Sequence, residues 1–101
     1  MLHMLVNTHN PESCAFRSPE EEAALAPSFM NFGEVAKQRG ATLHGSWVNP
    51  GSHTVFLLID AANAHVVDQV VREAGLIGRT STQVFAVDDT QAVLAEAGQD
   101  G

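Results

Sequence analysis

The stretch ATLHGSWVNPGSHTVFLLID, residues 41–60, predicts a β-hairpin. Two runs rich in apolar residues, 41–48 and 53–60, flank the residues Asn49-Pro50-Gly51-Ser52, which favour a tight turn. Pairing Asn49 with Ser52 places one set of side chains on a single face: His44, Ser46, Val48, His53 and Val55. The other face carries Leu43, Trp47, Phe56 and Leu58, and because it is the more apolar one we expect it to meet helices.

The hairpin is the middle of a β-α-β-β-α-β order. Short apolar runs predict the first strand of the chain at Leu2 to Thr8 and the last at Thr80 to Val87. A helix is expected to begin at Ser18-Pro19 and to kink or split at Pro27, and a second should run from Asn63 to Ala74. A short terminal helix is expected over residues 89–96. The order predicts one α+β, ferredoxin-like domain over residues 1–97, with sheet order 4-1-3-2, two helices on one face and a flexible tail at 98–101.

A sheet covered by helices on one face leaves its other face open, and a 101-residue chain has a modest core. We therefore expect a homodimer. The residues Gly45-Ser46-Trp47, Gly51, Thr54-Val55-Phe56 and Asp60 resemble the dimeric α/β-barrel superfamily, which includes muconolactone isomerases and cofactor-free monooxygenases. The opening Thr8 to Cys14 also resembles uncharacterised short proteins of that fold. The resemblance implies two facing sheets that enclose a small pocket.

Composition excludes several classes of function. The net charge of −7, with only five Lys and Arg, argues against binding to nucleic acid or to anionic membranes. A single cysteine, Cys14, excludes an intramolecular disulfide. Glycine-rich phosphate loops and G-x-S-x-G are absent from the sequence, so we expect no organic cofactor. Residues 1–7 lack the features of a signal peptide, which predicts a cytoplasmic location.

Strand direction gathers metal-binding residue types at one end of the predicted sheet. His9, Glu12 and Cys14 follow the first strand, and His53 opens the third strand at that same end. Adjacent strands lie about 4.8 Å apart, so these side chains could share one ion, whereas His44 lies at the opposite end. Imidazole, thiolate and carboxylate are ligands that zinc, copper and nickel prefer. The polar loop around Cys14 predicts an accessible thiol.

The leading hypothesis is a dimeric protein that binds a transition metal and acts on or carries a small molecule. His9, Cys14 and His53 would be the ligands, and Glu12 a fourth ligand or a base beside them; Asn7, Ser46 and Val55 would line the pocket. A second hypothesis is a cofactor-free isomerase-like or monooxygenase-like enzyme in which His44 or His53 moves a proton. A third is a non-enzymatic association or ligand-sensing module. Each residue also has an ordinary structural interpretation: a buried cysteine, surface histidines and a solvated glutamate.

Overall fold

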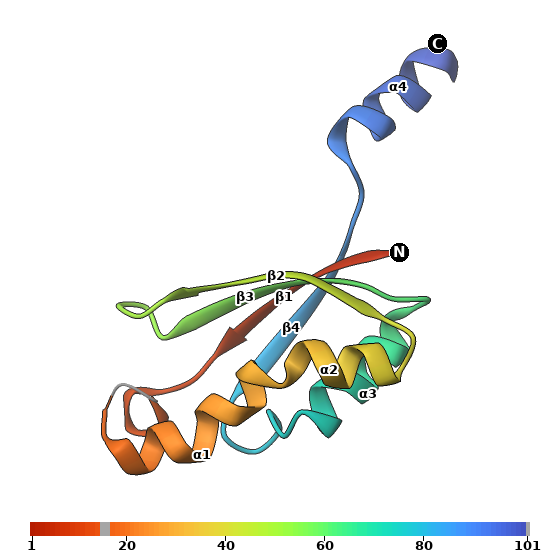
Figure 1. The fold of residues 1–101 in the computed structure, drawn as a ribbon. Coiled ribbons are helices and arrows are strands. Elements are labelled where there is room, and N and C mark those ends of the chain that lie inside the picture. The colour runs from red at the N-terminus through yellow and green to blue at the C-terminus, as the bar shows by residue number, and fades with distance from the viewer. Residues whose placement is uncertain (15–16, 101) are drawn as a thin grey trace.

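The computed structural model describes residues 1–14 and 17–100 of the chain. It confirms the α+β class and the predicted order of elements (Figure 1). The strands are β1 (Leu2–Thr8), β2 (Thr42–Asn49), β3 (Thr54–Asp60) and β4 (Ser81–Val87). The helices are the 3₁₀ turn η1 (Pro11–Ser13), α1 (Pro19–Met30), α2 (Phe32–Gln38), α3 (Ala64–Glu73) and α4 (Thr90–Asp100). Residues 98–100 of the expected tail are therefore helical, and residue 101 lies outside the described part.

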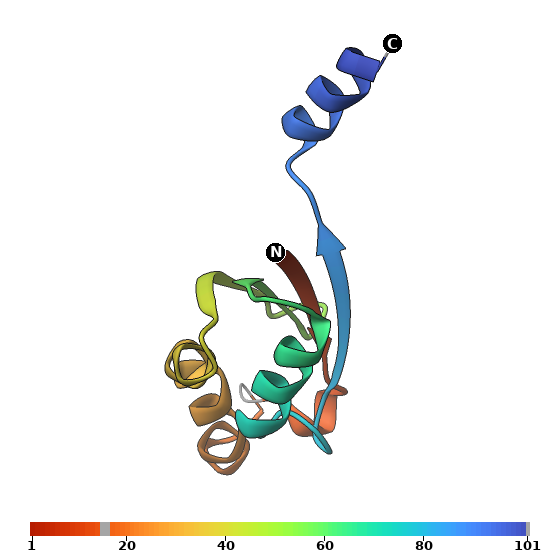
Figure 2. The same ribbon diagram turned by 90° about the vertical axis from the view of Figure 1, so that its right-hand side faces the viewer.

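The four strands form one sheet in the order β2-β3-β1-β4, with each neighbouring pair antiparallel, as the sequence predicts. Helices α1, α2 and α3 lie on one side of this sheet, whereas α4 points away from it beyond β4 (Figures 1 and 2). The side under the helices is called the covered face below, and the opposite side the open face. No helix within the described ranges has the length and apolar character needed to cross a membrane.

Local capping explains where the helices begin. The Ser18 hydroxyl accepts a hydrogen bond from the backbone N–H of Glu21 at 3.2 Å, at the predicted start of α1. Pro27 lies inside α1, and the helical chain divides one turn later, at Asn31, whose N–H donates to the Pro27 carbonyl at 2.9 Å. The predicted break is thus present, but it is displaced by one turn.

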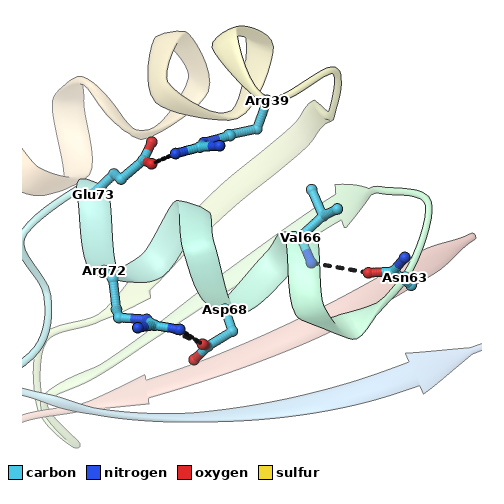
Figure 3. A network of polar contacts seen from close by, with 6 residues as sticks. All are labelled: Arg39, Asn63, Val66, Asp68, Arg72 and Glu73. Atoms are coloured by element: carbon cyan, nitrogen blue, oxygen red, sulfur yellow. Dashed lines mark hydrogen bonds and ion pairs between the residues drawn. The ribbon is translucent and has the colours of Figure 1, made fainter.

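Helix α3 is fixed at both ends by polar contacts (Figure 3). The Asn63 side chain accepts from the N–H of Val66 at 3.0 Å and caps its first turn. Near its end, Arg72 pairs with Asp68 at 2.6 Å within the helix, and Glu73 pairs with Arg39, which follows α2. Of these two exposed pairs, Arg39–Glu73 connects α3 with the end of α2, and each pair contributes little to the free energy of unfolding.

The predicted assignment of the hairpin faces is wrong. Val55, with Leu57 and Ile59, is buried under the helices on the covered face, whereas Trp47 and Phe56 are exposed on the open face. Ser46 and Val48 share the face of Val55, as predicted, but this face is the covered one and not the one that points away from the helices. The covered face is set by where the helical connections pass, and the larger aromatic side chains remain on the other face.

The turn of the hairpin also differs from the prediction. Asn49 pairs with Thr54 and Val48 with Val55, so residues 50–53 form the loop and His53 precedes β3 instead of opening it. His53 adopts a left-handed backbone conformation, with φ of 53°, which closes this longer loop. A shift of register between Leu43 and Gly45 turns Leu43 toward the core, so Leu43 does not share a face with Trp47.

Candidate metal centre

Three separate segments bring His9, Cys14 and His53 together beyond the end of β1. His9 follows β1, Cys14 follows the η1 turn, and His53 ends the hairpin loop. One ligand atom from each residue lies within 4.8 Å of the other two. A tetrahedral zinc site with bonds of about 2.0–2.3 Å spaces its ligand atoms about 3.5 Å apart. Small side-chain rotations would therefore bring this set onto one ion.

Backbone hydrogen bonds hold the three residues in place. The N–H of His9 donates to the carbonyl of His53 at 3.2 Å, which ties the end of β1 to the hairpin loop. The N–H of Cys14 donates to the Pro11 carbonyl at 3.3 Å and closes the η1 turn. The two imidazole rings meet edge to face, with their centres 5.3 Å apart and their planes at 72°. The pairing is thus built by the fold and does not depend on flexible side chains alone.

Three of the four imidazole nitrogens of this cluster are buried and lack a hydrogen-bond partner among the described residues. Both ring nitrogens of His9 and Nδ1 of His53 have no hydrogen-bond partner among residues 1–14 and 17–100. A buried polar atom without a partner destabilises the fold by about 1–3 kcal/mol, and native structures contain few of them. A metal ion would satisfy one nitrogen of each ring, so the residues present fit such a group.

The electrostatics of the cluster favour neutral imidazole. Burial lowers the pKa of His9 below its ordinary value, and the positive charge that His53 can carry lowers it further. A histidine must be neutral to ligate a metal. At neutral pH His9 is therefore already in its ligating form.

An apolar cavity of about 240 Å³ adjoins the cluster on the covered face. His9 and Cys14 form one part of its wall, and β2 and β3 supply Ser46, Val48 and Val55. Helix α1 contributes the opposite wall with Leu25, Ala26, Phe29 and Met30. The thiol is buried, since Cys14 is only 6% exposed, so the prediction of an accessible thiol is wrong.

Other predicted site residues lie elsewhere. Glu12 is exposed and is not part of the cluster. His44 is exposed on β2, near the opposite end of the sheet. Asn7 is fully buried, and its amide donates to the Thr80 and Thr82 hydroxyls, each at 2.8 Å, but it does not line the cavity. The predicted pocket residues Ser46 and Val55 do line a cavity, on the covered face and not between two sheets.

The sequence prediction missed the contribution of α1 to this cavity. Leu25 and Phe29 show helical apolar spacing in the sequence, which predicts a buried helix face. That signal does not distinguish a helix packed tightly on a sheet from one that leaves a space beside it. The small side chains of Ala26 and Ser46 are among the residues that line the space, and folding alone brings these two segments to one cavity.

Comparison with solved structures shows the same fold in proteins of very different sequence. SCO4226 from Streptomyces coelicolor A3(2) matches with a TM-score of 0.60 at 16% identity, over 87% of this chain and 98% of that protein. A protein from Deinococcus radiodurans R1, described as a "putative transposase", matches with a TM-score of 0.50 at 18% identity, over 99% of this chain and 89% of that protein. At these identities the likeness concerns the fold alone. A search of curated proteins gave no match.

The comparison with family models assigns the chain to one family, whereas the resemblance to muconolactone isomerases concerned a whole superfamily. That resemblance is supported only as far as a small α+β domain. A family model matches residues 12–98, which is most of the chain and includes Cys14, His53 and the wall of the cavity that α1 forms. The chain belongs to the family described as "Domain of unknown function (DUF3303)".

Proposed function

We propose that this protein binds one transition metal ion through His9, Cys14 and His53 and uses it to hold a small molecule in the adjoining cavity. The observation that carries the proposal is the convergence of three ligand atoms within 4.8 Å, with buried imidazole nitrogens that lack other partners. The two nitrogen donors and one sulfur donor suit zinc, copper or nickel.

The ligand count favours a reactive or binding centre over a structural one. Structural zinc sites are closed by four protein ligands, whereas sites that bind substrates keep one position open. Within the described residues the cluster supplies three. A bound ion would supply Lewis acidity at the open position. The protein's own part is to hold the two histidines beside each other through the His9–His53 backbone hydrogen bond and to present apolar walls on the side of the cavity.

Metal titration of protein purified without an affinity tag tests this proposal. We expect one zinc ion per chain in the wild type, and loss of affinity by at least about a hundredfold in His53→Ala and Cys14→Ala, since each removes a direct ligand. His44→Ala is the matched control, because it removes an exposed imidazole distant from the cluster. This variant should bind zinc as the wild type does. Absence of binding in the wild type, or equal loss in the control, would contradict the metal site.

The cavity supports a second candidate, a cofactor-free enzyme with an apolar pocket. His44 does not line the cavity, so in this candidate the proton would be moved at His53 or at its neighbour His9, which does line it. A wild-type protein that binds no metal, yet binds small apolar molecules and loses this binding when Ala26 is enlarged, would favour this candidate.

We also propose that the open face pairs with a second copy of the chain. Its aromatic residues are well exposed: Trp47 by 56%, Phe56 by 37% and Phe85 by 49%. Contiguous exposed apolar surface of this kind is typical of interaction sites. The projecting helix α4 adds exposed Val93 and Leu94, which could reach the partner (Figure 2). Analytical ultracentrifugation at micromolar concentration should show a dimer, and a monomer would contradict the proposal.

A further inference from the structure

We infer that the ligand of the cavity is a small apolar molecule with one anionic donor group, a carboxylate or thiolate, which takes the open position on the metal. This inference rests on the proposed metal site and adds the chemical class of the ligand. It follows from the size of the cavity, from the character of its walls and from the charge that the ligand set leaves on the ion.

The size of the cavity suits one ring with a short linker. The cavity measures about 240 Å³. An apolar cavity of about 150 Å³ is sufficient to hold benzene. The space beside the cluster therefore accommodates a single ring or a short branched chain, together with the atoms that join it to a donor group.

The walls of the cavity determine which part of the ligand lies where. Leu25, Phe29 and Val55 are apolar. Apart from the cluster residues, Ser46 is the residue with a polar side chain among those that line the cavity. Walls of this kind favour an apolar body, because burying apolar surface is favourable and burying an unpartnered polar group is not. His9 and Cys14 lie at the same cavity, so a ligand whose body fills the cavity has its donor end at the metal.

The charge of the ligand set favours an anionic donor. Two neutral imidazoles and one thiolate on a divalent ion leave one positive charge in a partly buried place. An anionic fourth donor neutralises it, whereas a cationic or neutral group does not. The ligand would therefore carry its charge at the metal end and none at the end held by α1.

The test compares ligands that share a donor and differ in apolar body. In cobalt-loaded protein the visible spectrum reports exchange of the fourth donor. Phenylacetate should bind at least about tenfold more tightly than acetate, or benzyl mercaptan at least about tenfold more tightly than 2-mercaptoethanol, because only the larger member fills the cavity. The pair that shows the preference identifies the donor as carboxylate or thiolate. Equal affinities within both pairs would overturn the inference while leaving the metal site in place.

A pair of substitutions on α1 separates the cavity from the metal. Ala26→Phe fills the cavity and should reduce the affinity for the apolar ligand at least about tenfold, with cobalt stoichiometry unchanged. Ala24→Phe makes the same change at an exposed position of the same helix and should have no effect. Ser46→Leu should repeat the effect of Ala26→Phe from the other wall. If the two α1 variants bind the ligand equally, the inference is wrong. A wild-type protein that binds no cobalt would instead contradict the proposed metal site.

Discussion

Val55 and Phe56 are neighbours in β3 and lie on opposite faces of the sheet. Val55 is 6% exposed on the covered face, beside the cavity and the candidate metal centre. Phe56 is larger and more apolar, and yet it lies on the open face beside Trp47. The comparison shows that the size of the apolar side chains does not decide which face of a sheet is buried within the chain.

The two faces also differ in their polar content. The covered face buries His3 and Asn7 and ends at His9 and His53, whereas the open face carries aromatic side chains. At Gly45 a Cβ atom would clash with the indole of Trp47, which lies over this glycine on the open face. The candidate metal centre thus adjoins the face with buried polar groups, whereas the proposed dimer contact uses the face with exposed aromatic groups.

The largest expected difference between the faces concerns folding itself. Val55→Asp places a carboxylate in the core and should reduce the free energy of unfolding by about 4 kcal/mol or more, which is a large part of the stability of a small domain. Phe56→Asp, one residue later, should leave the subunit folded because its side chain faces outward. Circular dichroism during urea unfolding measures both variants. Similar stability in the two variants would contradict the assignment of the faces.

The next effect concerns the dimer proposed above. Phe85→Asp should raise the dimer dissociation constant by about a hundredfold, or about 2.7 kcal/mol, because a charge enters an apolar interface. Glu34→Ala, an exposed change on α2, is the control on the opposite side of the sheet. Sedimentation velocity across a dilution series gives the constant. A variant that dimerises like the wild type would show that the open face is not the interface.

A smaller effect is expected at Asn7 in β1. Asn7→Ala removes two hydrogen bonds, to Thr80 and Thr82, and should reduce the free energy of unfolding by about 2 kcal/mol. Thr8→Ala, at the adjacent exposed position, should change it by less than about 0.5 kcal/mol. Urea unfolding of both variants makes the comparison. An equal change in both would mean that Asn7 does not hold the start of β4 against β1.

The sequence predicts the strands, their order and the end of the sheet at which the candidate cluster lies. These features follow from short apolar runs, from turn residues and from strand direction, all of which are local or topological. Strand direction alone was enough to bring His9 to His53. The position of Cys14 depends on the η1 turn, and the sequence placed it near the site without specifying its burial.

The features that the sequence did not predict depend on packing between distant segments. Trp47, Phe56 and Leu58 form the more apolar set, and periodicity cannot show that the helices cover the other one. Pro50-Gly51 suggests a two-residue turn, whereas the left-handed conformation of His53 extends the loop to four residues, 50–53. Glu12 has the right chemistry and the right position in the sequence, but its side chain is exposed.

The smallest expected effect is a dependence of stability on pH at the site end of the covered face. The folded state lowers the pKa of His9, through burial first and the charge of His53 second, so protonation favours the unfolded chain. In metal-free protein, the contribution of His9 to the free energy of unfolding should therefore be complete above the ordinary histidine pKa of about 6.5. This contribution should be lost as the pH falls from there through the lower pKa of the folded state. The His9→Gln variant has no imidazole at this position and should lose less stability over the same pH interval. The His65→Gln variant, changed at an exposed position of α3, should behave like the wild type. Urea midpoints measured with a chelator present, from neutral to mildly acidic pH, give these differences. If His9→Gln and the wild type lose stability in parallel, the imidazole of His9 is not held neutral by the fold, and its readiness to ligate a metal at neutral pH would have to come from the ion itself.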